Sequence, residues 1–212
     1  MSTTNAATAL QADRSGPREL ILEAAIDVFS AAGYQGFRLA DVAKRAGFGY
    51  GLVYYYFKSK DDLLQALFEE RFRWFYERLE RATQAGGSIN DIVTRVIRCT
   101  FDSYVEDPRA MSVLLLTGAR SPAIKGGATQ MEFMRIIAMA AQLFGAAIET
   151  GEISSKLNPT LLAMQLYGAV ELGLLSIIAG LCDGVTTRDA ADQIAACFLA
   201  GVATGAPAAA AA

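Results

Sequence analysis

Histidine is absent from all 212 residues of this chain. Histidine-based catalytic triads and histidine-ligated metal sites are therefore excluded. A pH sensor near neutrality is disfavoured, because histidine is the side chain that titrates there. The sequence also has no metal-ligand cluster and no nucleophile motif, so we expect no enzyme activity, no metal and no cofactor.

Cysteine is scarce, and its three occurrences are widely spaced. Cys99, Cys182 and Cys197 form no CxxC pair. This pattern predicts reduced, buried thiols in a cytoplasmic protein, and it leaves open a thiol-sensing role for one of them.

Charge is also sparse, since charged residues make up 19% of the chain and hydrophobic residues 53%. A composition this apolar indicates that part of the surface is buried between subunits. Residues 1–14 lack the continuous apolar stretch of a signal peptide, and residues 205–212 are rich in alanine. We expect both ends to be tails outside the folded domains.

Two short helices separated by a tight turn are predicted between Leu39 and Phe57. Gly47 follows the first helix, where a left-handed C-terminal cap favours glycine. Gly49 lies at the N-cap of the second helix, which spans Tyr50 to Phe57. Two helices joined this closely are the helix-turn-helix signature. The second helix is too short to be stable alone in water, so the rest of the domain must hold it.

The second helix has two different faces at 100° per residue. The inward face is predicted to carry Val53, Tyr54 and Phe57. The outward face is predicted to carry Tyr50, Gly51, Leu52 and Tyr55. Large side chains beside a bare glycine on an outward face suit a partner surface that presses close to the backbone, such as the major groove of DNA.

A basic patch surrounds this motif. Between Gly36 and Lys60 there are five cations, against the single carboxylate of Asp41. The cations are Arg38, Lys44, Arg45, Lys58 and Lys60. Because the whole chain has a net charge of −3, the positive field is local to this segment.

A longer set of residue types occurs here at fixed spacings. Its members are Gly33, Tyr34, Leu39, Ala40, Asp41, Val42, Ala43, Ala46, Gly47, Gly51, Tyr54, Tyr55, Phe57, Ser59, Lys60 and Leu63. Over roughly Ser15 to Phe75 this set resembles the N-terminal domain of the TetR family of transcriptional regulators. The resemblance implies an all-α homodimer. It places a helix-turn-helix DNA-binding domain at 15–75, with its motif at about 38–57, and a helical ligand-binding and dimerisation domain at 76–204.

The resemblance also implies the function and the interface with double-stranded DNA. The function implied is a ligand-responsive regulator, a repressor by default, released from a near-palindromic operator by a small, largely apolar effector. The expected DNA-binding residues are Arg38, Leu39, Lys44, Gly49, Tyr50, Gly51, Leu52, Tyr54, Tyr55, Tyr56 and Lys60.

The sequence departs from the family pattern at three places. Phe37 and Arg38 stand where Thr or Ser usually caps the first motif helix, Gly49 replaces a common serine, and Leu52 replaces a residue that is often polar. No Arg, Lys, Asn or Gln remains between Gly49 and Phe57. We therefore expect readout by Leu52 against thymine methyl groups, by tyrosine hydroxyls and by DNA shape. An alternative is a dimeric ligand- or protein-binding module with weak or no operator recognition.

Helical periodicity continues through the rest of the chain. Further helices are predicted at 17–32, from a Ser59 cap through Leu79, at 88–106, 109–117, 131–148, 158–181 and 187–203. A loop is predicted at 118–127. The helix after Ser59 leaves the DNA-binding domain and is expected to link it to the second one.

The predicted helix at 158–181 is apolar almost all round, and its length would suit a membrane span. Gln165 and Glu171 within it, and the lack of flanking cationic clusters, argue against a membrane. We expect it to be buried against its own domain and a second copy of the chain. The last two helices of each subunit would then form a four-helix dimer contact.

A ligand pocket is indicated only weakly by aromatic and methionine side chains. The candidates are Phe101, Tyr104, Met111, Met134, Tyr167 and Glu171. Glu171 is the most suggestive polar residue, because a carboxylate within an apolar helix must be paired, hydrated or facing a ligand. A partner in Arg95, Arg98 or Arg135 is as consistent with the sequence as an effector.

Overall fold

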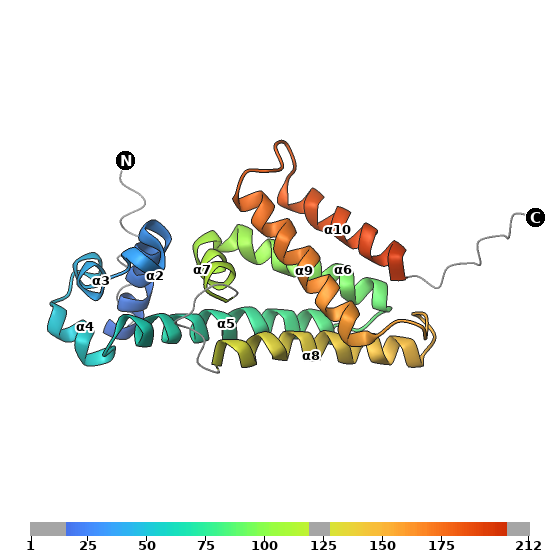
Figure 1. Cartoon of the computed structure of the whole chain (residues 1–212), viewed down its shortest axis with the longest axis horizontal. Helices are drawn as coiled ribbons and strands as arrows, with labels where there is room; N and C mark the ends of the chain where they lie inside the picture. Colours follow the sequence, from blue (N-terminus) through green and yellow to red (C-terminus); the bar gives the residue numbers. More distant parts are fainter. Residues whose placement is uncertain (1–15, 119–127, 203–212) are drawn as a thin grey trace, which may run out of the picture. The chain divides into compact units, whose positions relative to one another are not determined.

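A computed structural model describes residues 16–118 and 128–202, which contain nine α-helices (Figure 1). The all-α fold class predicted from the sequence is confirmed. The helices are α2 (Pro17–Gly36), α3 (Leu39–Ala46), α4 (Tyr50–Tyr56), α5 (Lys60–Gln84), α6 (Ile89–Glu106), α7 (Pro108–Gly118), α8 (Ala128–Glu149), α9 (Pro159–Ile178) and α10 (Thr187–Val202). The predicted tails and most of the predicted 118–127 loop lie outside the described residues.

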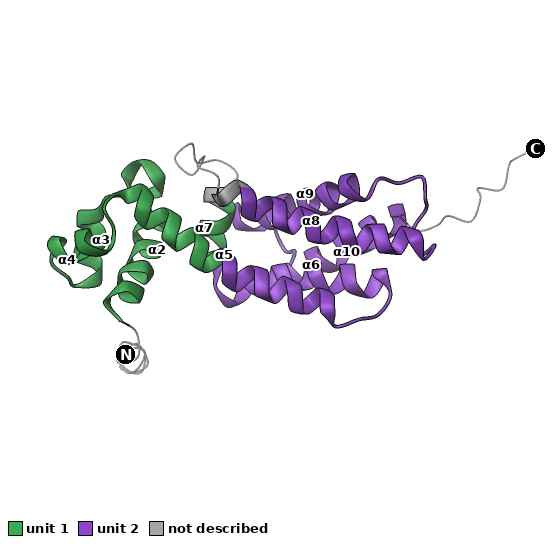
Figure 2. Cartoon of the chain, turned by 90° about the horizontal axis from the view of Figure 1, so that it is seen from below, with its two compact units in different colours: residues 1–71, 109–129 green, residues 72–108, 130–212 purple. Residues whose placement is uncertain are grey.

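The chain divides into two compact units, coloured separately in Figure 2. Unit 1 comprises Met1–Arg71 and Arg109–Thr129, and unit 2 comprises Phe72–Pro108 and Gln130–Ala212. Unit 1 therefore contains α2, α3, α4, the first half of α5 and also α7. Unit 2 contains the second half of α5 with α6, α9, α10 and nearly all of α8.

Unit 1 has one hydrophobic core to which every one of its helices contributes. Ile21 and Leu22 of α2, Val42 of α3, Val53 of α4 and Leu67 of α5 are almost completely buried in it. Val113 of α7 joins the same cluster. The short helices of the motif are thus held by burial of their apolar side chains, the dominant favourable term in folding.

The helix-turn-helix has the local geometry that its glycines predict. Gly47 is left-handed, with φ 74° and ψ 21°, and its N–H caps the carbonyls of Ala43 and Lys44. The bounds of α3 agree with the prediction. The N-cap positions Arg38 and Gly49 make no side-chain capping hydrogen bond, as the departures from the family pattern imply.

The first helix was predicted to end at Gly33, and its regular backbone does break there. Gly33 has φ 61° and ψ −178°, a conformation open chiefly to glycine. A further helical turn follows and extends α2 to Gly36, so the predicted end at Ala32 is too early. The broken helix brings Phe37 into the core of unit 1, where its ring lies 6.0 Å from that of Phe29.

Hydroxyl and amide caps fix the start of the longer helices. The Ser59 hydroxyl accepts from the Asp62 N–H at 3.1 Å before α5. Ser88 and Asp91 form a reciprocal capping box at α6, and the Asn158 side chain accepts from the Leu161 N–H at 3.0 Å at α9. Such caps satisfy N–H groups that the helix itself leaves without partners.

Unit 2 is built around α6, α9 and α10. Phe101 and Ile97 of α6, Leu174 of α9 and Ala195 of α10 are buried between them. At Gly173, a Cβ atom would lie 2.4 Å from the Cδ1 atom of Ile194. Glycine at this position therefore lets the end of the Ile194 side chain of α10 lie directly against the backbone of α9.

Two helices of unit 2 expose much apolar surface in the single chain. Met131–Glu149 and Pro159–Ile178 are long and apolar enough to cross a membrane by length and composition, which is weak evidence by itself. Only 17% and 28% of these windows is buried. Most of the surface of these two helices is therefore exposed within the part of the chain that the structure describes.

The predicted burial of the cysteines is wrong at two positions. Cys99 is half-buried, whereas Cys182 and Cys197 are exposed. Cys182 follows α9 in the connection to α10, and Cys197 lies on the outward face of α10. Burial raises the pKa of the Cys99 thiol, so less of the reactive thiolate form is present at neutral pH.

Two glycine substitutions should test the turn between α3 and α4. Gly47→Ala should destabilise the protein by about 1 kcal/mol, because alanine is strained at positive φ. Gly51→Ala should be neutral or stabilising by up to about 1 kcal/mol, because Gly51 is helical with open space around it. Urea denaturation measures both changes, and equal destabilisation by the two would contradict this account of the turn.

Candidate nucleic-acid interface

Helix α4 is anchored by two buried residues and presents the remainder of its surface to solvent. Val53 and Phe57 are buried, as predicted. The prediction that Tyr54 points inward is wrong, since 47% of it is exposed. Tyr56 packs against the core instead, at helical spacing from Val53. Tyr50, Leu52 and Tyr55 are exposed as predicted, with Tyr55 at 70%.

The exposed tyrosines are ordered by one another and by Lys58. The Tyr50 and Tyr54 rings stack with their centroids 6.1 Å apart, which explains why Tyr54 turns outward. The Lys58 ammonium donates to the carbonyls of Tyr54 and Tyr55 at 3.0 and 3.1 Å. It also lies 5.1 Å from the centre of the Tyr54 ring. Lys58 thereby satisfies carbonyls at the end of α4 and favours the observed placement of the Tyr54 ring.

A second lysine is held at the start of α5. The Lys60 ammonium lies 4.1 Å from the centre of the Tyr34 ring and donates to the Tyr34 carbonyl at 3.4 Å. The Tyr34 hydroxyl donates to Asp61 at 2.9 Å, and this bond raises the pKa of Tyr34. These contacts position a cation beside the tyrosine-bearing helix.

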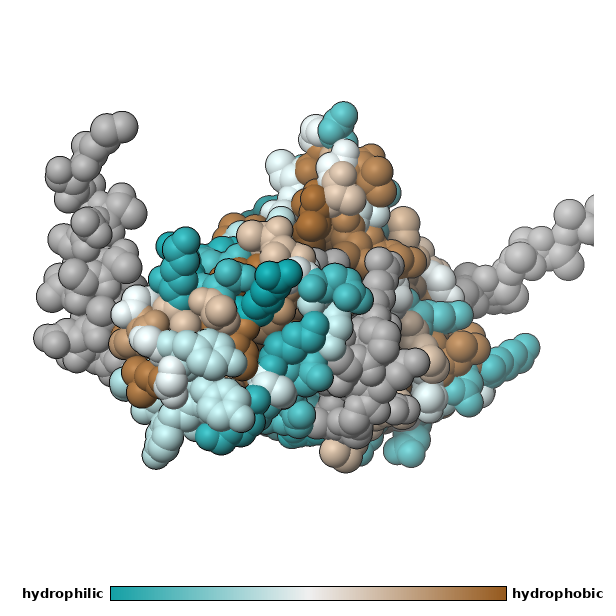
Figure 3. All heavy atoms as spheres, turned by 60° about the vertical axis from the view of Figure 1, so that its left-hand side comes forward, coloured by the Kyte–Doolittle hydropathy of each residue, from teal (hydrophilic) through white to brown (hydrophobic). Residues whose placement is uncertain are grey.

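The other predicted DNA-binding residues differ in accessibility. Arg38, Lys44, Gly49 and Gly51 are exposed. The Leu39 side chain is in the core of unit 1, so only its main chain, at the first position of α3, remains available to a phosphate. Figure 3 brings forward the part of the molecule that carries α3 and α4, and there hydrophilic side chains surround rings of intermediate hydropathy.

Arg45 of the basic patch is paired with a carboxylate. Its guanidinium donates to Asp27 of α2 at 2.5 and 2.8 Å. This pairing could not be predicted from the sequence, because the two residues are 18 positions apart on different helices.

The candidate pocket residues do not all lie in one unit. Met111 belongs to unit 1, whereas Phe101, Tyr104, Met134, Tyr167 and Glu171 belong to unit 2. Phe101 and Met111 are buried, Tyr104 is half-buried and Met134 is exposed.

Tyr167 and Glu171 are brought together one helical turn apart on α9. Burial raises the pKa of Tyr167, and so do the charge of Glu171 and the hydrogen bond to it. The Phe133 ring of α8 packs edge-on against Tyr167 at 4.8 Å. Each of the three arginines considered as partners for Glu171 has another contact: Arg95 with Ala82 and Gly86, Arg98 with Asp192, and Arg135 with Glu132.

An open groove of about 480 Å³ lies between α5 and α8 of unit 2. Its lining residues include Tyr76, Glu80, Arg135, Met139 and Gln142. The Arg135 guanidinium lies 4.4 Å from the centre of the Tyr76 ring. None of the predicted pocket residues lines this groove, which arises from packing between distant helices and has no local sequence signal. Among the residues that the structure describes, no group of three or more potential metal ligands is found.

An exposed, aromatic second helix of a helix-turn-helix, flanked by cations, defines a DNA-binding protein of the regulator class. Residues 21–67 match the family described as bacterial regulatory proteins, tetR family. These residues form a DNA-binding domain of the TetR family, and the chain is a ligand-responsive, DNA-binding transcriptional regulator.

Individual relatives agree with this assignment. The chain is 26% identical over 151 residues to the fatty acid metabolism regulator protein of Bacillus subtilis, spanning 71% of this chain and 78% of the relative. A TetR-like transcriptional regulator from Rhodococcus sp. RHA1 has a similar structure, with a TM-score of 0.74, 26% identity and coverage of 89% and 96%. The regulator FadR from Bacillus subtilis in complex with stearoyl-CoA shares the fold, with a TM-score of 0.73, 21% identity and coverage of 87% and 98%.

Replacing Lys60 should reveal a phosphate contact. Lys60→Ala should weaken binding to all duplexes similarly and lower the slope of log affinity against log salt by about one. Fluorescence anisotropy at several salt concentrations measures the slope. Lys156→Ala removes an exposed lysine from unit 2 and should leave the slope unchanged. An unaltered slope in Lys60→Ala would contradict the assignment.

Proposed function

We propose that the chain is a homodimeric repressor that leaves a near-palindromic operator when a small, largely apolar effector binds. Residues 15–75 act as the DNA-binding domain and residues 76–204 as the effector and dimerisation domain. The observation that carries this proposal is α4, whose exposed tyrosines and Leu52 stand on a helix anchored by Val53 and Phe57.

The α4 surface suits a particular kind of readout. Without Arg, Lys, Asn or Gln on α4, the bidentate pairings with guanine and adenine are not available. Leu52 would contact thymine methyl groups, and the tyrosine hydroxyls would bond to phosphates or base edges. The two copies of α4 would enter successive major grooves about 34 Å apart. The same lack of Arg, Lys, Asn and Gln favours the second candidate, a dimeric ligand- or protein-binding module with weak or no operator recognition.

The dimer would form through α9 and α10. Leu161, Met164 and Leu172 of α9 are all exposed in the single chain, with Leu172 at 64%. Ala196 and Cys197 provide small exposed side chains on α10. A face that is both apolar and closely approachable is suited to an identical copy around a two-fold axis.

The effector proposed is a compound with a long acyl chain. The Bacillus subtilis relative is named as a regulator of fatty acid metabolism, and a protein of the same fold binds stearoyl-CoA. Unit 2 offers Phe101, Tyr104, Met134 and Tyr167 as apolar lining, with Glu171 as a polar group. We place this activity in the cytoplasm and assign the chain no catalytic step, in keeping with relatives named as transcriptional regulators.

A charge on the exposed face of α9 should separate the subunits. Leu172→Arg should convert the protein to a monomer in analytical ultracentrifugation, because burying an unpaired guanidinium in an apolar interface is costly. Val105→Arg introduces the same charge at a position on α6 that is 58% exposed. It should leave the dimer intact. Dimers in both variants, or a monomeric wild-type protein, would refute the proposed interface.

Stearoyl-CoA should release the protein from DNA. The probe is a duplex that the wild-type protein selects from a random-sequence pool, and its affinity is measured by fluorescence anisotropy. Saturating stearoyl-CoA should weaken binding by about tenfold, within the usual range of allosteric coupling. Coenzyme A without an acyl chain is the control and should have no effect. Equal effects of both compounds, or of neither, would reject the acyl effector.

A selection that enriches no sequence would instead favour the second candidate. Such a result would not affect the match to the family, but it would refute the proposed recognition of a specific operator.

A further inference from the structure

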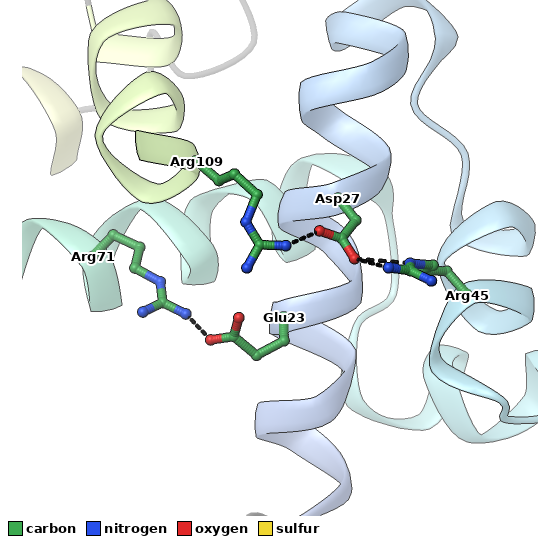
Figure 4. A network of polar contacts seen from close by, with 5 residues as sticks. All are labelled: Glu23, Asp27, Arg45, Arg71 and Arg109. Atoms are coloured by element: carbon green, nitrogen blue, oxygen red, sulfur yellow. Dashed lines mark hydrogen bonds and ion pairs between the residues drawn. The ribbon is translucent and has the colours of Figure 1, made fainter. Parts of the chain in front are cut away.

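The chain passes between the two units at three points, and an arginine marks the first two of them. Unit 1 ends its first segment at Arg71 and begins its second at Arg109. Arg71 pairs with Glu23, and Arg109 pairs with Asp27. Glu23 and Asp27 are four residues apart on α2 and therefore lie on one face of it. Figure 4 shows both pairs converging on that helix.

Asp27 differs from Glu23 because it serves two helices. One carboxylate oxygen accepts from Arg109 of α7, and the other accepts from Arg45 of α3 at 2.5 and 2.8 Å. The Asp27 side chain is only 20% exposed. The Arg45 and Arg109 side chains are 61% and 57% exposed, so solvent weakens each pair, and what distinguishes the arrangement is that one carboxylate receives charge-assisted hydrogen bonds from two helices.

Arg45 lies where the position of α3 affects DNA binding most directly. It is in the last turn of α3, two residues before the left-handed Gly47 that starts the turn to α4. A restraint on Arg45 therefore restrains the point from which α4 begins.

Because Arg109 and Arg45 bind the two oxygens of one carboxylate, a change in one contact affects the other. If Arg109 is displaced, both oxygens of Asp27 become available to Arg45, and the side chain can turn toward a two-oxygen contact with it. Arg109 is also the first residue of unit 1 after Pro108, so a displacement transmitted along the chain from unit 2 through this junction would act directly on the contact.

We propose that Asp27 is a positioning residue for DNA binding, through which Arg109 at the start of α7 acts on Arg45 and the helix-turn-helix. The inference rests on the proposed function, because it supplies a route by which a change in unit 2 alters operator affinity. The Glu23–Arg71 pair is the matched control, since it joins α5 to α2 and shares no carboxylate with α3.

The test measures whether the effect of Arg109 depends on Asp27. Affinity for the selected duplex is measured for the full-length wild type, Asp27→Asn, Arg109→Gln and the double variant. Arg109→Gln should weaken binding about threefold in the wild-type background and by less than about 1.5-fold in the Asp27→Asn background, a non-additivity expected for coupled groups. Equal fold-changes in the two backgrounds, or no effect in the wild type, would overturn the proposal.

The control experiment repeats the same measurements with Arg71→Gln in place of the Arg109 variant. Its effect should be the same with and without Asp27→Asn, and a dependence on Asp27 as large as that of Arg109 would indicate general loosening and overturn the proposal. If Asp27→Asn does not fold by circular dichroism, the same measurement in an Arg45→Gln background decides the question. If the wild type binds no DNA at all, the proposed function itself is refuted. That outcome differs from equal fold-changes among variants that still bind, which would overturn only the role of Asp27.

Discussion

Burial of Val53 and Phe57 is the interaction on which the DNA-binding surface depends. A helix of seven residues has too few internal hydrogen bonds to offset the cost of starting it. The two side chains anchor α4 in the core of unit 1, which consequently supplies the free energy that keeps α4 helical. The tyrosines can be exposed because the anchors are completely covered. Loosening the core would remove the recognition surface before it removed the rest of the helices.

The same core explains why α7 belongs with the motif. Val113 packs into the cluster that contains Val42 and Val53, although it lies about 60 residues after Val53 in the sequence. Arg109 adds an ionic contact to Asp27 at the other end of the same segment. Unit 1 is therefore completed by a piece of chain that returns from unit 2. The two units are connected by three passages of the chain, through α5, through the junction before α7 and near the start of α8.

Local patterns predicted the elements well, and tertiary contacts explain the exceptions. The bounds of α3, the left-handed Gly47 and the caps at Ser88 and Asn158 follow from short-range chemistry that a sequence shows directly. Tyr54 was misassigned because a helical wheel allows either Tyr54 or Tyr56 beside Val53 and Phe57. The choice was made by stacking of Tyr54 on Tyr50 and by its contact with Lys58. The Asp27 contacts and the groove between α5 and α8 join distant helices, for which one sequence carries no signal.

The contact at Gly173 limits how the protein can vary. The missing Cβ leaves space that the Ile194 side chain fills, so α9 and α10 are interlocked at this point. A methyl group at position 173 would meet the flexible end of the Ile194 side chain, which would have to take another rotamer. Ile194 therefore keeps its present conformation only while position 173 carries no side chain.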